Sequence, residues 1–479
     1  MQKNGQQNQT PQKGNPPREA EPVKSTTERL GTEPLVPLLF RLAAPSIIGM
    51  AVQALYNVVD TVYVGHVSKT ALSALSLAFP IQMILIAIAV GTGVGTNSLI
   101  SRRLGQGKEC EANNVAEHVF LLAFVYALVI GVIGAIFYKD IVRIFTDDPE
   151  LIKLSGTYIR IIMIGSGAMF IPMITNNILR GEGNTFLPML TLIIGAVINI
   201  GIDPLLIYGL GPFPELGVAG AAYATVFARL ASGIFIVVVL LKGDHQIKLR
   251  LKDFTYSGQI IKDVYKVGFP AMLMQLLASF MIAGMNKIVV AFNVTAVAVV
   301  GVFFRLQSFI LMPVFGLGQG YIPIVGYNYG YKNPGRMKEA IRYGMVIGEV
   351  FTFVGFLLFQ VIPRPLIKMF NSDPEFVQMG VEALRRISIA YPLVGAAIVG
   401  STTFQAVGKG FPSLVLSVLR QLILFLPIMY LLGQIWGLPA LWLAFPISAG
   451  ITIVLMYFWL RKTLKMIFTR LEGEETGSP

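Results

Sequence analysis

Apolar residues dominate this chain in long continuous runs that are separated by short polar segments. A helix that crosses a bilayer needs about 20 mostly apolar residues. A transmembrane β-barrel would show short alternating strands instead, so the pattern predicts an all-α membrane protein. Twelve runs meet the length, at 37–64, 71–100, 115–138, 153–178, 186–209, 217–241, 262–291, 296–325, 339–362, 378–405, 411–433 and 439–461.

The composition agrees with burial in lipid. Hydrophobic residues make up 54% of the chain and charged residues 13%, whereas soluble domains carry about 25% charged residues. The segments at 1–34 and 466–479 are polar, so we expect a disordered N-terminal tail and a short C-terminal tail. The first of them lacks the apolar core of a signal peptide.

The net charge of +12 comes largely from basic residues in the loops between the apolar runs. Lysine and arginine gather in alternate loops, for example after 71–100 and after 217–241. This bias predicts a multi-pass protein of the cell membrane with both termini in the cytoplasm. No basic domain suggests nucleic-acid binding. A single cysteine, Cys110, and three dispersed histidines argue against a disulfide or a zinc site.

The two halves of the sequence resemble each other at one fixed offset. Pro45 matches Pro270 (270 − 45 = 225), and the loop FTDDPE at 145–150 matches FNSDPE at 370–375. A row of glycines at 91, 93, 95 and 105 recurs at 316, 318, 320 and 330. We predict two parallel six-helix lobes at 35–242 and 262–465, joined by a cytoplasmic linker at 243–261. Such pairs suit alternating access, and we expect a monomer.

Two acids lie inside apolar runs of the first lobe. Asp60 and Asp203 both fall late in outward-running spans, so they share a depth. Asn199 is one helical turn before Asp203, and Thr225 reaches a similar depth. Carboxyl, amide and hydroxyl oxygens suit a hard cation or a held proton. The alternative is that these groups only join helices, but unpaired carboxylates are poor for that purpose.

The second lobe lacks these acids, because the equivalent positions are Met285 and Ile428. It carries other charged residues within its spans, for which we expect a structural ion-pair network: Arg305, Glu349 and Arg420. Arg229, one turn after Thr225, either pairs with an acid or lines a substrate cavity. The coupling chemistry is therefore expected in the first lobe.

The chain resembles the multidrug and toxic compound extrusion (MATE) family over about 35–465. The resemblance rests on AAPSIIGMAVQALYNVVDTVYVG (43–65), ILRGEGN (178–184), NIGIDPLLIYGLG (199–211) and GVAGAAYAT (217–225). It is nearest to the branch with acids in the N-terminal lobe. It implies a V-shaped pair of lobes that exports amphipathic, often cationic compounds against Na⁺ or H⁺ entry.

The resemblance also assigns residues. Asp60, Asn199, Asp203 and Thr225 match the cation site of the family. Gln53, Tyr56 and Asn176 match cavity positions, where we add Arg229, and Pro45 matches a proline at which the first helix bends. The stretches MLMQLLASF (272–280) and YPLVGAAIVG (391–400) lack the acids of other branches.

Three other functions remain to be compared with export. A lipid-linked saccharide flippase is the alternative that the buried arginines keep open. An intramembrane enzyme would need a nucleophile with a base, or a metal set, and the sequence offers neither. A channel would need a selectivity ring. The sequence leaves the choice between Na⁺ and H⁺ open, and it implies no organic cofactor.

Overall fold

The computed structural model describes residues 26–249 and 254–476, and its regular elements are helices. Ten of the described helices are long and apolar enough to cross a membrane, and two bent helix pairs raise the number of spans to twelve. This confirms the all-α membrane architecture.

Each half of the chain supplies one set of helices. Those of the first half are α2 (Leu35–Val67), α3 (Lys69–Gly105), α4 (Glu109–Arg143), α5 (Pro149–Ile164), α6 (Gly167–Gly181), α7 (Phe186–Ile207) and α8 (Val218–Lys242). Those of the second half are α9 (Gly258–Val290), α10 (Val294–Gly330), α11 (Pro334–Val361), α12 (Pro363–Lys368), α13 (Pro374–Ser388), α14 (Tyr391–Ala406), α15 (Gly410–Val418), the π-helical η2 (Leu419–Phe425), α16 (Leu426–Trp436), α17 (Leu438–Leu441) and α18 (Ala444–Thr476).

Two spans that the sequence predicts as single helices are bent. The axes of α5 and α6 meet at 47°, and those of α13 and α14 meet at 53°. The breaks fall at equivalent places of the repeat, near Gly165 and Ala390 (390 − 165 = 225). Pro392, in the first turn of α14, has no N–H group to bond back to the last turn of α13.

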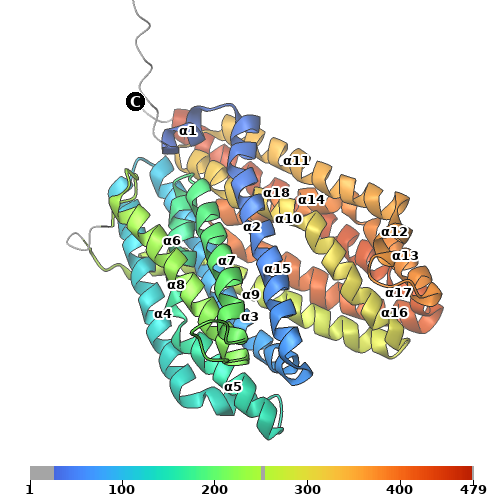
Figure 1. Ribbon diagram of the computed structural model, residues 1–479. Coiled ribbons are helices and arrows are strands. Elements are labelled where there is room, and N and C mark those ends of the chain that lie inside the picture. The colour runs from blue at the N-terminus through green and yellow to red at the C-terminus, as the bar shows by residue number, and fades with distance from the viewer. Residues whose placement is uncertain (1–25, 250–253, 477–479) are drawn as a thin grey trace, which may run out of the picture.

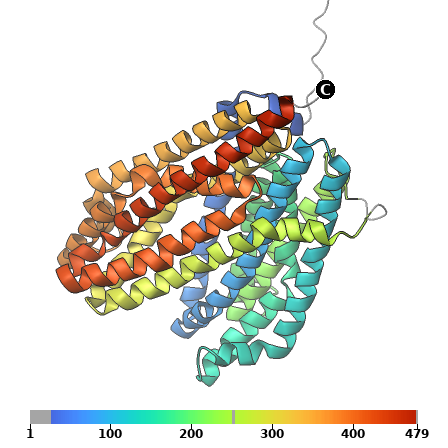
Figure 2. The same ribbon diagram turned by 180° about the vertical axis from the view of Figure 1, so that it is seen from behind.

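The two sets of helices form two bundles that diverge from one end of the molecule (Figures 1 and 2). The bundles meet where α3 packs along α9 and α10 packs along α2. α1 (Thr26–Thr32) and the end of α18 lie at the end where the bundles converge. The arrangement is the V-shaped pair of lobes that the resemblance implies.

Six of the eight repeated glycines lie in the contact between the lobes. A methyl group at Gly91 would meet Met272 of α9 and would lie 2.6 Å from the carbonyl oxygen of Gly268. At the equivalent Gly316 it would lie 2.5 Å from Ile47 of α2, and Ile47 is the repeat partner of Met272. Small residues allow helix backbones to approach closely in membranes. The glycine row is therefore kept in both halves because each half packs against the first helix of the other.

We expect Gly95→Ala to destabilise the contact between the lobes. A methyl group at this position would overlap the backbone carbonyl of Val264, and overpacking costs about 1–3 kcal/mol. The melting temperature of the purified protein should fall. Gly301→Ala is the matched control, because nothing lies within 4 Å of a methyl group there. Equal melting temperatures for the two variants would contradict this packing.

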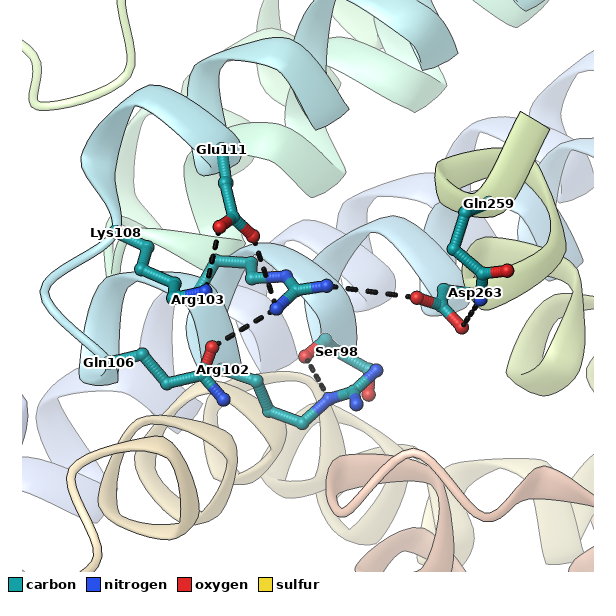
Figure 3. A network of polar contacts seen from close by, with 8 residues as sticks. All are labelled: Ser98, Arg102, Arg103, Gln106, Lys108, Glu111, Gln259 and Asp263. Atoms are coloured by element: carbon teal, nitrogen blue, oxygen red, sulfur yellow. Dashed lines mark hydrogen bonds and ion pairs between the residues drawn. The ribbon is translucent and has the colours of Figure 1, made fainter. Parts of the chain in front are cut away.

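A polar network joins three helix ends where the lobes converge (Figure 3). Arg103, at the end of α3, contacts Glu111 of α4 at 3.1 Å and Asp263 of α9 at 3.7 Å. Lys108 also contacts Glu111, at 2.7 Å. The Asp263 contact crosses from the first lobe to the second, so the network adds an ionic connection to the glycine contact.

The predicted N-terminal tail at 1–34 is too long. Residues 1–25 lie outside the described residues, but α1 is helical and Leu30 is fully buried. The Leu30 carbonyl accepts a hydrogen bond from Asn328 of α10, and the Thr27 hydroxyl donates one to the carbonyl of Glu182. The seven residues are mostly polar, but they contact both lobes, so tertiary contacts fix their helical structure.

The predicted C-terminal tail at 466–479 also needs correction. α18 continues to Thr476, and Ile467 and Leu471 are buried at 5% exposure each. Glu472 contacts Lys338 of α11 at 3.3 Å. The end of α18 therefore packs on the second lobe instead of leaving it.

Glu182 connects the loop after α6 with the segment between the lobes. One of its oxygens accepts a hydrogen bond from His245 Nδ1 at 2.8 Å, and the other accepts one from the backbone N–H of Ile247 at 3.3 Å. Glu182 is 2% exposed. The hydrogen bond with Glu182 raises the pKa of His245 above its usual value, although burial opposes this. Asp244 acts in the same direction as Glu182.

This pair predicts a specific pH dependence of stability. A raised folded-state pKa means that the stabilisation is complete below about pH 6.5, the unfolded value, and is lost as the pH rises through the folded-state pKa. His245→Gln should therefore lower the melting temperature at about pH 6, by roughly 2–4 °C for each kcal/mol lost. The difference from the unaltered protein should shrink at about pH 9. A pH-independent difference would contradict the role of His245.

Candidate functional site

The two acids of the first lobe come together between α2 and α7. Asp203 is fully buried and Asn199 is 2% exposed, both on α7. The Asn199 Nδ2 group donates to Asp203 Oδ1 at 3.2 Å, as their spacing of one helical turn predicts. α7 continues through Pro204 to Ile207, so Pro204 removes one backbone hydrogen bond without ending the helix.

Asp60, on α2, reaches the same place. Its carboxyl group lies within hydrogen-bonding reach of the Asp203 carboxyl group. Two ionised carboxylates repel each other and both accept hydrogen bonds, so this contact needs a proton or another cation between them. Asp60 Oδ1, Asp203 Oδ2 and Asn199 Oδ1 are buried without a hydrogen-bond partner in the described part of the chain. The site therefore has oxygen atoms available for a positive ion.

Arg229 of α8 is the positive group of the site. It lies within hydrogen-bonding reach of the Tyr56 hydroxyl group and interacts electrostatically with Asp60. Tyr56 precedes Asp60 by one turn of α2, which places both side chains on one face. The sequence left two roles open for Arg229, which interacts electrostatically with Asp60 but, among the described residues, forms no ion pair with either acid. One ionised acid, one protonated acid and one guanidinium together have no net charge.

The sequence did not identify Tyr158 of α5 and Gln82 of α3 as part of this site. The Gln82 Nε2 group donates to the Tyr158 hydroxyl oxygen at 2.8 Å, and the Tyr158 side chain interacts electrostatically with both Asp60 and Arg229. One signal was available, because Gln82 recurs as Gln307 in the repeat. Gln307 lies close to a tyrosine, Tyr391, in the second lobe.

The other predicted residues of the first lobe lie around this centre. Thr225 is buried on α8 at 6% exposure, one turn from Arg229, and among the described contacts no hydrogen bond joins it to either acid. Gln53 is exposed on the same face of α2 as Asp60. Asn176 of α6 is buried, and its Oδ1 has no hydrogen-bond partner among the described residues. α2 runs through Pro45 without a break.

The second lobe does not form the ion-pair network that we expected. Among the residues described, no ion pair joins Arg305, Glu349 or Arg420. Glu349 Oε2 instead accepts a hydrogen bond from the backbone N–H of Ala396 at 3.1 Å, in the second turn of α14. Met285, the counterpart of Asp60, is fully buried in an apolar cluster.

Comparisons with known proteins agree with this geometry. The family model MatE matches residues 45–205 and 270–431. The FAD transporter of Shewanella oneidensis is 27% identical over 89% of this chain and 94% of that protein. The multidrug export protein MepA of Staphylococcus aureus is 25% identical, over 85% and 89%. A solved outward-facing MATE transporter has a TM-score of 0.87 at 28% identity, over 93% of this chain and 99% of that chain.

Proposed function

Because this chain belongs to the MATE family of membrane transporters, we propose that it exports amphipathic small molecules in exchange for protons. The observation that carries the proposal is that the Asp60 and Asp203 carboxyl groups lie within hydrogen-bonding reach of each other. The contact is buried, lies on two helices of one lobe and needs a positive ion to persist.

Arg229 supports a proton over Na⁺ as the coupling ion. A guanidinium group that interacts electrostatically with Asp60 repels a second cation near that carboxyl group. A proton is held by a covalent O–H bond within the carboxyl pair, so it does not need the several oxygen ligands that hard metal ions take. The protonated site is then neutral, whereas the deprotonated site has one negative charge.

This change of charge provides the coupling. In the proposed cycle, a proton from the outer side enters the Asp60–Asp203 pair and removes its negative charge. The affinity of the first lobe for a cationic cargo falls, so the cargo leaves outward. Linkage requires the reverse effect, in which bound cargo favours release of the proton. Both effects use the same pair of carboxyl groups.

We expect Asp60→Asn and Asp203→Asn to abolish export of a cationic dye by proteoliposomes. Asparagine matches the shape of aspartate but cannot take up a proton, so the coupling is lost. Coupling of typical size changes the affinity for the cargo about 5–150-fold. Asp147→Asn is the matched control, because Asp147 is exposed in the loop after α4. Export at the control rate by both variants, at equal protein amounts, would overturn the proposal.

The choice of ion is tested with separate gradients across the same vesicles. A pH gradient should drive dye export, and a Na⁺ gradient should not. Arg229→Gln should gain dependence on Na⁺, because the repulsion between the guanidinium group and a metal ion is gone. Arg160→Gln, an exposed arginine of α5, should keep the original behaviour. Export driven by Na⁺ alone in the unaltered protein would contradict proton exchange.

A dinucleotide is a second candidate cargo. One relative is named an FAD transporter, and two arginines occupy the interior of the first lobe here. Arg229 interacts electrostatically with Asp60, and Arg180 of α6 donates to Gln319 of α10 at 3.3 Å. Arginine is suited to the phosphates of such a cargo. FAD and a lipid-linked saccharide, offered to the same vesicles, separate dinucleotide export and flippase activity from dye export.

A further inference from the structure

A basic cavity lies where the lobes converge, and neither Asp60 nor Asp203 lines it. Its volume is about 250 Å³, and its walls come from the ends of α3, α10 and α18 and from the turn before α15. Lys332, Lys409 and Arg470 line it, and among its described lining residues none is acidic. Gln106 and Tyr329 add polar groups, so the cavity fits an anion that accepts several hydrogen bonds.

The backbone of Lys332 is strained. Among the described residues, Lys332 is the only one other than glycine with a positive φ, at 59°. Its repeat partner in the first lobe is Gly107 (332 − 107 = 225), with a φ of 71°. Both residues follow the end of a long helix, and the next N–H group closes the turn onto Arg103 in one case and Asn328 in the other. The first lobe thus uses the residue that this conformation favours.

This conformation is unfavourable for a lysine, because its Cβ atom crowds the following carbonyl oxygen. The turn itself does not require a lysine, because Gly107 makes the same turn in the first lobe. Backbone strain that the fold does not require is characteristic of functional positions. The side chain at 332 lines the cavity together with Lys409 and Arg470, so the strain places one of its three cations.

The surface next to the cavity favours a lipid. Met466 and Arg470 also line a second, shallower hollow on α18 with Lys462 and Lys465. This hollow continues from the cavity along a membrane-spanning helix, whose end lies where the lobes converge (Figure 2). Basic pockets between transmembrane helices, next to apolar surface, suit anionic lipid headgroups. A free phosphate would not use the adjoining apolar surface.

We propose that this cavity binds the phosphate headgroup of an anionic phospholipid, with the acyl chains along α18. Gln106 belongs to the first lobe and the three cations to the second. A lipid bound here therefore contacts both lobes at the place where they converge. The site is separate from the Asp60–Asp203 pair and does not depend on the identity of the cargo or the coupling ion.

The test uses full-length protein in detergent, and the readouts are native mass spectrometry and the melting temperature. Phosphatidylglycerol or cardiolipin should remain bound and raise the melting temperature, and phosphatidylcholine should do neither. Inorganic phosphate at the same concentration is the second arm. If it reproduces the stabilisation, or if phosphatidylcholine does, the lipid headgroup assignment is overturned.

Two variants separate binding from folding. Lys332→Gly relieves the strained backbone, so its melting temperature without lipid should be equal or higher, while the number of retained anionic lipids falls. Lys409→Gln should weaken retention without changing the backbone. Lys242→Gln, an exposed lysine at the end of α8, is the control and should retain lipid. Undiminished lipid retention by Lys332→Gly and Lys409→Gln together would overturn the proposal.

Discussion

The contact between Asp60 and Asp203 is the constraint on which the proposed mechanism depends. Two carboxyl groups from different helices lie within hydrogen-bonding reach in a buried site. Such a pair is stable only when a positive ion or a proton compensates the repulsion. Because one acid is on α2 and the other on α7, a change in occupancy acts on the packing of these helices. Because Arg229 contributes one positive charge, a single proton is enough to make the site electrically neutral.

The duplicated architecture places this pair without repeating it. Both halves keep the glycine contact, in which each lobe packs against the first helix of the other. Only the first half keeps the acids, and Met285 fills the equivalent place with apolar packing. The two lobes therefore share their packing but not their chemistry. The repeat also shows that Lys332 is unusual, because the equivalent turn of the first lobe has a glycine, Gly107, in the same positive-φ conformation.

Much of the fold could be predicted from the sequence, because the bilayer strictly limits the length and composition of a helix that spans it. The spans follow from hydrophobic length, and Asp60, Asn199 and Asp203 follow from their common depth and helical spacing. The bend near Gly165, the burial of Leu30 and the end of α18 could not be predicted, because each depends on contacts with distant helices. For the same reason, the sequence did not decide between the two roles of Arg229. It predicted an ion pair for Glu349, which instead accepts a hydrogen bond from a backbone N–H.

The central claim is that cargo and proton compete through one carboxyl pair. The most direct measurement is the number of protons that the detergent-solubilised protein releases into weakly buffered solution when a cationic cargo binds. The account predicts release that approaches one proton per molecule, is unaffected by Na⁺ and is absent when position 203 is asparagine. Cargo binding with no proton release, or release that persists in the asparagine variant, would contradict it.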